Sequence, residues 1–315
     1  LSLLLAVVMV IGMMVVGASA ASSDFTDSDE ITNTEAVGVM TALGVFEGTD
    51  SGAFDPSGTL TREQAAAIIC RMLLGDDAES LTTNSVVFSD VATDRWSAGY
   101  IGYCAQQGIL AGTGNGTFDP EGELTGLAFA KMLLVALGYD PAIEQYVGND
   151  WAVNVAADAV DAGISVSGII MANAMTREQA AQMAFQTLEA DVVYYTNKGT
   201  TVIGSDGMQV IVGASAPVKV SNSKTDDYRG SSKGDEVQQF CEKYFSDLKL
   251  STTGSDDFGR PADQWKNGGK EIGTYSATAD ATYTEQVKSK TIYSDLGLSK
   301  TTPATVTVDG ESAAD

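Results

Sequence analysis

The sequence contains two arginines whose positions suit them to bind an anion. The segment Thr61-Arg62-Glu63-Gln64 recurs as Thr176-Arg177-Glu178-Gln179. Residues 21–190 hold only five basic side chains, and Arg62 and Arg177 both occupy this repeated position. A planar guanidinium pairs with a carboxylate through two hydrogen bonds, and the unpaired amides at a helix start also attract anions. We therefore expect an anion site at these helix starts, with simple pairing to neighbouring acidic side chains as the alternative.

The composition excludes several classes of chemistry. The 315 residues include 42 acidic and 18 basic side chains and no histidine, for a net charge of −24. Without histidine there is no Ser-His-Asp or Cys-His nucleophile and no histidine-bound zinc. A surface this acidic disfavours nucleic acids and anionic bilayers as partners. We expect no enzymatic activity, no nucleic-acid partner and no cofactor, although weak calcium binding and a carboxylate pair for glycoside hydrolysis stay open.

Helical units are expected to position the two arginines. In each Thr-Arg-Glu-Gln segment the threonine and glutamine fit a capping box, in which each side chain accepts from the other residue's backbone amide. A preceding helix is predicted from Trp96 to Gln107, and Gly108 suits the left-handed conformation that ends helices. The helix after Thr61 is predicted from apolar residues at helical spacing, namely Ala65, Ile68, Ile69, Met72 and Leu73.

Self-comparison shows that the first half of the chain is an internal repeat. An offset of 64 residues aligns Gly44-Val45-Phe46 with Gly108-Ile109-Leu110, and Gly52-Ala53-Phe54-Asp55-Pro56 with Gly116-Thr117-Phe118-Asp119-Pro120. A third, shorter copy leads to Thr176 and lacks the Phe-Asp-Pro turn. In the first two copies we expect the phenylalanine of this turn to hold the loop against the core. One two-helix unit cannot bury both of its faces, so we expect the three copies to pack in a pseudo-threefold arrangement with clefts between neighbours.

These spaced residues resemble the S-layer homology (SLH) domain, whose Thr-Arg-Ala-Glu signature is similar to the two Thr-Arg-Glu-Gln segments. The resemblance covers about residues 24–190. It implies that the chain anchors an exported protein to the bacterial cell wall by binding a secondary cell-wall polysaccharide, often pyruvylated, in grooves between units. Carried over by position, the polysaccharide-binding residues would be Arg62, Glu63, Gln64, Trp96, Trp151, Arg177, Glu178 and Gln179.

The chain departs from the SLH pattern in two units. Gly126 stands where the arginine is expected in unit two, and the capping box is lost there as well. Unit three lacks the Phe-Asp-Pro turn, and Ser167 replaces the glycine found in the other units. We therefore expect at most two competent grooves. Trp96 and Trp151 have an alternative role in the core, because an aromatic residue in the first turn of a helix is often buried.

The predicted fold class is α+β. Residues 1–20 are expected to be a secretory signal peptide without its basic region, followed by SLH repeats at 24–75, 88–139 and 150–190. A smaller β-rich domain of unknown role, truncated at the end of the chain, is expected at 199–315. It would contain a hairpin at 200–203 and 209–212, one helix at 236–248, and strands near 274–275, 281–283 and 305–308.

The functional prediction is a surface-layer or surface-display protein held non-covalently at the cell wall, with no stable membrane insertion after signal cleavage. Two alternatives stay open: a wall-anchored hydrolase whose catalytic module lies beyond residue 315, and a lattice protein that self-associates through residues 191–315. The three cysteines, Cys70, Cys104 and Cys241, are too few for a disulfide scaffold, and we expect buried thiols rather than a bridge.

Overall fold

The computed structural model describes residues 24–83, 87–203, 209–276, 287–297, 307–308 and 311–312. The signal peptide predicted at 1–20 and the strand predicted at 281–283 lie outside the described residues. The chain is a mixture of helix and sheet, with its small sheets in the C-terminal part. It forms two compact units, one reaching Val220 and including Val237–Phe245, the other made of Ser221–Glu236 and the residues from Ser246 onward.

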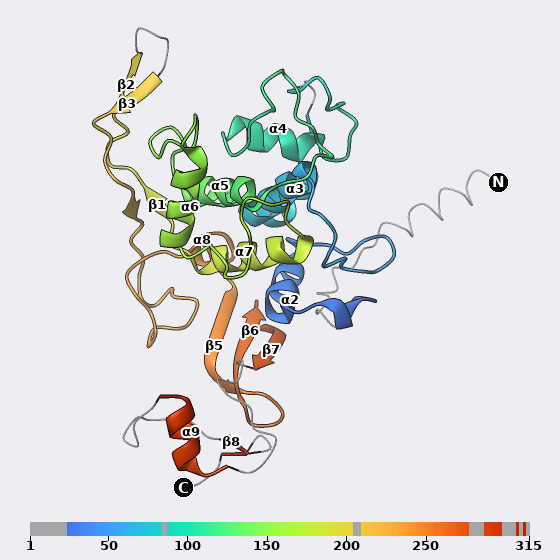
Figure 1. Ribbon diagram of the computed structural model, residues 1–315, viewed down its shortest axis with the longest axis vertical. Helices are drawn as coiled ribbons and strands as arrows, with labels where there is room; N and C mark the ends of the chain where they lie inside the picture. The colour runs from blue at the N-terminus through green and yellow to red at the C-terminus, as the bar shows by residue number, and fades with distance from the viewer. Residues whose placement is uncertain are drawn as a thin grey trace, which may run out of the picture. The chain divides into compact units, whose positions relative to one another are not determined.

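Each predicted repeat contributes two helices to the first unit (Figure 1). In every repeat the second helix packs against the first helix of another repeat, so that α3 contacts α4, α5 contacts α6 and α7 contacts α2. The predicted capping boxes at Thr61 and Thr176 are both present. The helices are α2 (Thr34–Ala42), α3 (Arg62–Leu74), α4 (Ala98–Gln106), α5 (Gly126–Leu137), α6 (Trp151–Asp161) and α7 (Arg177–Glu189), with short 3-10 helices at Ser28–Glu30 and Gly75–Ser80.

The segments that precede α3, α5 and α7 exchange backbone hydrogen bonds in a closed cycle. The Leu60 amide donates to the Met175 carbonyl at 2.9 Å, and the Met175 amide donates to the Leu124 carbonyl at 3.0 Å. The Leu124 amide completes the cycle by donating to the Leu60 carbonyl at 3.0 Å. All three side chains are buried, so the cycle lies in the core and holds the starts of the three helices together.

The Phe-Asp-Pro turns of the first two repeats are built in the same way. The Asp27 carboxylate accepts from the amides of Phe54 and Asp55, both at 2.7 Å, and Asp90 does the same for the second turn. Asp55 and Asp119 adopt a φ of 60°, in the left-handed region. Phe54 and Phe118 are fully buried, which confirms that each phenylalanine holds its loop against the core.

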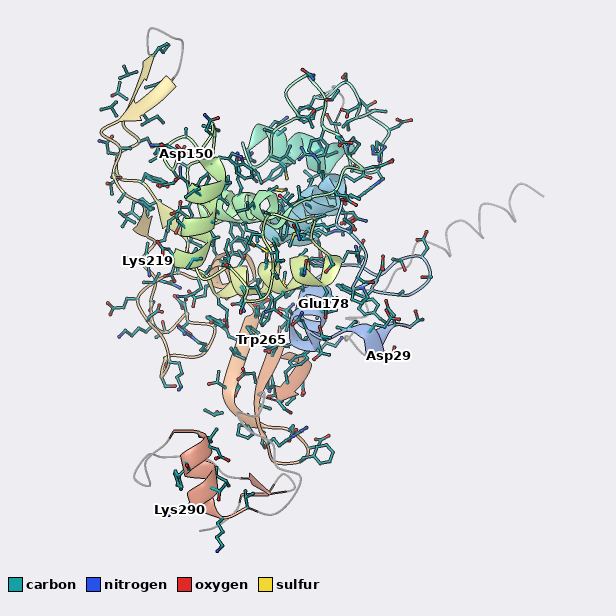
Figure 2. All side chains as sticks on the ribbon, viewed as in Figure 1. Asp29, Asp150, Glu178, Lys219, Trp265 and Lys290 are labelled. Carbon is teal, nitrogen blue, oxygen red and sulfur yellow. The ribbon has the colours of Figure 1, made fainter. Side chains whose placement is uncertain are left out.

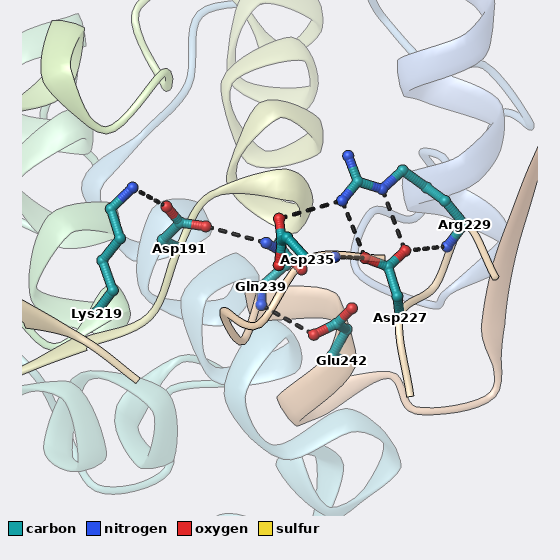
Figure 3. A network of polar contacts seen from close by, with 7 residues as sticks. All are labelled: Asp191, Lys219, Asp227, Arg229, Asp235, Gln239 and Glu242. Carbon is teal, nitrogen blue, oxygen red and sulfur yellow. Dashed lines mark hydrogen bonds and ion pairs between the residues drawn. The ribbon is translucent and has the colours of Figure 1, made fainter. Parts of the chain in front are cut away.

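After α7 the first unit continues through short strands. β2 (Thr200–Ile203) pairs antiparallel with β3 (Gln209–Val212), which confirms the predicted hairpin, and β1 (Val193–Tyr194) pairs with β4 (Val218–Lys219). The helix predicted at 236–248 is present but shorter than expected, because only α8 (Phe240–Tyr244) is helical. The residues before it pair with the chain near Asp191: the Val192 amide donates to the Gln238 carbonyl, and the Gln239 side chain donates to the Asp191 carboxylate at 3.1 Å (Figure 3).

The second unit is built on a three-stranded antiparallel sheet in the order β5-β6-β7, with strands at Leu248–Ser255, Pro261–Asn267 and Lys270–Ser276. Trp265 is buried and stacks on Tyr228, with ring centroids 6.1 Å apart. Arg229 pairs with the buried Asp227 at 3.0 Å (Figure 3). The remaining elements are α9 (Ser289–Asp295), β8 (Thr307–Val308) and β9 (Glu311–Ser312).

Candidate functional site

The amides at the start of α3 and α7 are already paired. The amides of Arg62 and Glu63 donate to the carbonyls of Gly122 and Pro120 at 2.9 and 3.0 Å. In α7 the first two amides donate in the same way to the carbonyls of residues 58 and 56. The third amide of each helix donates to the capping threonine. The expectation of unpaired amides for an anion at these helix starts is therefore wrong, because a turn from another repeat occupies them.

The two arginine side chains connect neighbouring repeats. Arg62 Nε donates to the Phe118 carbonyl at 2.8 Å and Nη2 to the Ala111 carbonyl at 2.9 Å. The Arg62 guanidinium also lies 4.5 Å from the centre of the Phe118 ring. Arg177 repeats this arrangement on the first repeat, with Nε 2.9 Å from the Phe54 carbonyl and Nη2 2.8 Å from the Glu47 carbonyl. Each arginine thus fastens the Phe-Asp-Pro loop of another repeat.

Burial lowers the pKa of both Arg62 and Arg177, although nearby aspartates oppose the shift. Neither guanidinium forms an ion pair with any acidic side chain of the described residues. The alternative of simple pairing with neighbouring acids therefore does not describe these arginines. A guanidinium has five N–H donors, and the loop carbonyls occupy Nε and one hydrogen of Nη2.

The glutamates that follow the arginines hold the start of a first helix in another repeat. Glu178 Oε1 accepts from the amides of Thr32 and Asn33 at 2.6 and 2.7 Å. Glu63 accepts from the Ser97 hydroxyl at 2.6 Å and forms an ion pair with Arg95 at 2.7 Å. Burial raises the pKa of Glu63, but the contacts with Arg95 and Ser97 outweigh it and leave the pKa below its usual value.

The two glutamines of the signature complete the capping boxes. Gln64 Oε1 accepts from the Thr61 amide at 3.1 Å, and Gln179 Oε1 accepts from the Thr176 amide at 3.0 Å. Of the predicted set, Arg62, Glu63 and Arg177 therefore make contacts that hold the repeats together, and Gln64 stabilises the start of its own helix. Only Glu178 and Gln179 also line a groove.

That groove lies between the third and first repeats and has a volume of about 440 Å³. Glu178, at the start of α7 (Figure 2), lies in its wall. The lining combines oxygen and amide groups with apolar surface from Pro56, Val166 and Ile169, and it includes no basic side chain. Most of the residues that line this groove were not predicted from the sequence. One signal was available, because Thr32 occupies the position in the first repeat that the predicted site residue Trp96 occupies in the second, 64 residues later. The lining consists of Glu30, Thr32, Asn33, Pro56, Ser57, Val166, Ser167, Gly168, Ile169, Thr176, Glu178, Gln179 and Gln182.

The two predicted tryptophans have different surroundings. Trp96 is 56% exposed, so the alternative of a core role is wrong for this residue. Its ring meets Tyr100 edge-on, with centroids 6.1 Å apart. Trp151 is half-buried, and Lys131 Nζ lies 6.0 Å from the centre of its ring. Both rings keep exposed surface that is available to a ligand.

The arginine missing from unit two and the turn missing from unit three belong to the same contact. The amides of Gly126 and Leu127 donate to the carbonyls of Asn173 and Met171, so α5 meets the shortened third repeat where α3 meets the full turn of the second. A Cβ on Gly126 would lie 3.0 Å from the Met171 Cα, which leaves little room for a side chain. Thr125 still caps the Ala128 amide at 3.3 Å, so only half of the capping box is lost.

Comparison with known proteins identifies two of the three predicted repeats. The family model of the S-layer homology domain matches residues 24–66 and 87–130. The chain carries S-layer homology domains. The third predicted SLH repeat, at 150–190, lies outside the matched ranges. Among the described residues, no helix combines the length and apolar character needed to cross a membrane.

Several curated proteins are similar to this chain, and the names of two of them place those proteins at the cell surface or cell wall. A cell surface protein of Thermoanaerobacter kivui is 32% identical over 200 residues, which cover 62% of this chain and 25% of the relative. A middle cell wall protein of Brevibacillus brevis is 25% identical over 163 residues, covering 52% and 15%. A cellulosome-anchoring protein of Acetivibrio thermocellus is 31% identical over 100 residues, covering 32% and 22%. The chain thus spans a quarter or less of the length of these relatives.

Proposed function

We propose that the SLH repeats form a pseudo-threefold domain that anchors the exported chain non-covalently to the bacterial cell wall. The closed cycle of hydrogen bonds among Leu60, Leu124 and Met175 supports this arrangement. The SLH matches and the surface-protein relatives support a location at the cell wall or surface. The ligand would be a secondary cell-wall polysaccharide bound in the grooves between repeats.

The groove between the third and first repeats is the observation that carries this proposal. Its wall presents hydroxyl, amide and carboxylate groups, which complement the hydroxyl and amide groups of a sugar. Because no basic side chain lines it, the groove suits the neutral part of a glycan. An anionic substituent would bind to the arginines, whose remaining N–H donors have no partner among the described residues.

The wall-anchoring role fits a surface-layer or surface-display protein that has no enzymatic activity over this length. One observation favours a second candidate, a wall-anchored hydrolase. An endoglucanase of a Bacillus species is 34% identical over 114 residues, which cover 34% of this chain and 12% of the relative. This match supports the use of such repeats beside a catalytic module, and the complete open reading frame distinguishes the two candidates.

Co-sedimentation of the full chain with purified cell walls tests the proposal. Gln182→Trp places a large ring in the groove and leaves the hydrogen bonds of Arg177, Glu178 and Gln179 in place, and we expect it to weaken wall binding roughly tenfold or more. Gln107→Trp is the matched control, because it places the same ring on an exposed glutamine at the end of α4. Walls stripped of their secondary polysaccharide should retain neither of the two variants. Equal retention of the two variants on intact walls would contradict the groove as the binding site.

A further inference from the structure

Two cysteines meet where the first and second repeats pack together. Cys70 lies in α3 and Cys104 lies in α4, and their Sγ atoms are 3.5 Å apart. Both side chains are completely buried, and the structure has them as two separate thiols, as expected from the sequence. Neither residue lines the groove or takes part in the arginine contacts, so the proposed function leaves this sulfur pair without a role.

The surroundings of the two sulfurs are reciprocal. Cys70 Sγ lies 3.5 Å from the Tyr100 carbonyl, one helical turn before Cys104. Cys104 Sγ lies 3.7 Å from the Ala66 carbonyl, one helical turn before Cys70. Each thiol therefore faces the opposite helix at the level of the other cysteine. A disulfide needs the sulfurs to approach by about another 1.5 Å.

The other two repeat contacts show what packing alone requires at this level. The 64-residue offset and the matching third-repeat alignment place Leu134 and Ala159 at the equivalent positions of α5 and α6. They place Phe185 and Met40 at those of α7 and α2. All four side chains are buried and apolar. Packing between repeats is thus satisfied without sulfur, and the paired cysteines are a local departure from the repeat.

We propose that Cys70 and Cys104 are joined by a disulfide in the exported protein, which cross-links the first repeat to the second. The inference rests on the cell-surface location in the proposed function, because disulfides form and persist outside the reducing cytosol. The oxidant is a disulfide, either a small molecule or an oxidised thiol-disulfide oxidoreductase.

The bond forms in two exchange steps. One cysteine thiolate attacks the oxidant disulfide, which gives a mixed disulfide and releases one thiol. The second cysteine thiolate then attacks the protein sulfur of the mixed disulfide and releases the second thiol. The cysteines lose two electrons and two protons, and the two released thiols gain them.

The folded environment determines when this reaction takes place. The hydrogen bond with Cys70, together with burial, raises the pKa of the Cys104 thiol, so the reactive thiolate is scarce once α3 and α4 have packed. We therefore place the oxidation during folding. After folding, burial protects the bond from reductants in the surroundings.

Peptide mapping of the full chain tests the cross-link. The chain is collected after export from a bacterial host, its free thiols are alkylated under denaturing conditions, and it is digested without reduction. We expect one alkylated cysteine, Cys241, and a linked peptide pair containing Cys70 and Cys104 that separates on reduction. Three alkylated cysteines, or a link to Cys241, would overturn the proposal. Refolding the purified chain in a glutathione redox buffer repeats the test independently of export.

The double variant Cys70→Leu with Cys104→Ala is the matched control, because it introduces the residues found between α5 and α6. We expect this variant and the reduced wild type to melt at similar temperatures, and the oxidised wild type to melt roughly 10 °C higher. Equal melting of oxidised and reduced wild type would also overturn the proposal, even if the double variant does not fold. Wall binding is measured separately. A chain that does not bind cell walls would contradict the anchoring function but not the disulfide between Cys70 and Cys104.

Discussion

The contact between the first and second repeats and the contact between the second and third are built on the same plan with different parts. In the first, Arg62 fastens a complete Phe-Asp-Pro loop through the carbonyls of Phe118 and Ala111. In the second, Gly126 meets a shortened loop at Met171, and there is neither an arginine nor a turn for it to hold. The arginine and the turn form one contact, so if either is absent the other has no partner to bind at that position.

The comparison changes the interpretation of the signature arginine. In this chain Arg62 and Arg177 each connect repeats through backbone carbonyls, and any ligand contact must use the N–H donors that remain. A loss of wall binding after substitution of either arginine would therefore mix two effects, a weaker domain and a missing ligand contact. Stability has to be measured beside binding for these variants.

The largest effect is expected from removing a buried ring that an arginine fastens. Phe118→Ala empties a fully buried site and should lower the free energy of unfolding of the first unit by about 3–5 kcal/mol. Ile170→Ala is the control in the shortened loop of the third repeat, where the side chain is 66% exposed, and should change stability by less than about 0.5 kcal/mol. Urea unfolding measures both values. Similar losses for the two variants would show that the loops do not differ as described.

A smaller effect is expected from the arginines themselves. Arg62→Ala and Arg177→Ala should each cost about 2 kcal/mol in urea unfolding, because each removes two charge-assisted hydrogen bonds. The two contacts share no residue, so the double variant should show the sum of the single losses within about 0.5 kcal/mol. A double variant no less stable than either single one would mean that the two contacts do not act independently.

The smallest effect concerns acid stability. Burial raises the pKa of Asp27 and of Asp90, but the backbone amides of their turns outweigh it and hold both pKa values below the usual value. Their stabilisation is therefore complete above about pH 5 and is lost as the pH falls through the folded-state pKa values. Asp27→Asn with Asp90→Asn should be less stable at pH 5 and should lose less stability between pH 5 and 2.

Asp29→Asn serves as the control for this measurement, because Asp29 is exposed and takes no part in either turn. The expected result is a pH profile that matches the wild type. A double variant whose stability falls as steeply as the wild type would place the acid sensitivity elsewhere in the chain.

The features that the sequence predicted correctly are those that depend on nearby residues. The capping boxes at Thr61 and Thr176 and the hairpin of β2 and β3 each involve residues close in the chain. The burial of Phe54 and Phe118 followed from their repeated turns. Local hydrogen bonding and the repeat pattern specify these features, so a single sequence is enough to find them.

The features that the sequence did not predict depend on partners far along the chain. Arg177 binds the carbonyls of Glu47 and Phe54, and backbone carbonyls leave no mark in the residue types of a sequence. The sequence predicts that the SLH repeats end at residue 190 and a separate domain begins at 199, yet the first unit reaches Val220 and includes Val237–Phe245. The Phe240 amide donates to the Ala190 carbonyl, which explains why the helix predicted at 236–248 is cut to α8.

The cycle formed by Leu60, Leu124 and Met175 has a consequence for how the domain is made. A chain released amino end first presents Leu60 long before Met175, the residue whose carbonyl its amide needs. The Leu60 amide therefore lacks its hydrogen-bond acceptor until the third repeat has been synthesised. The cycle of hydrogen bonds among the three repeats closes only at that point.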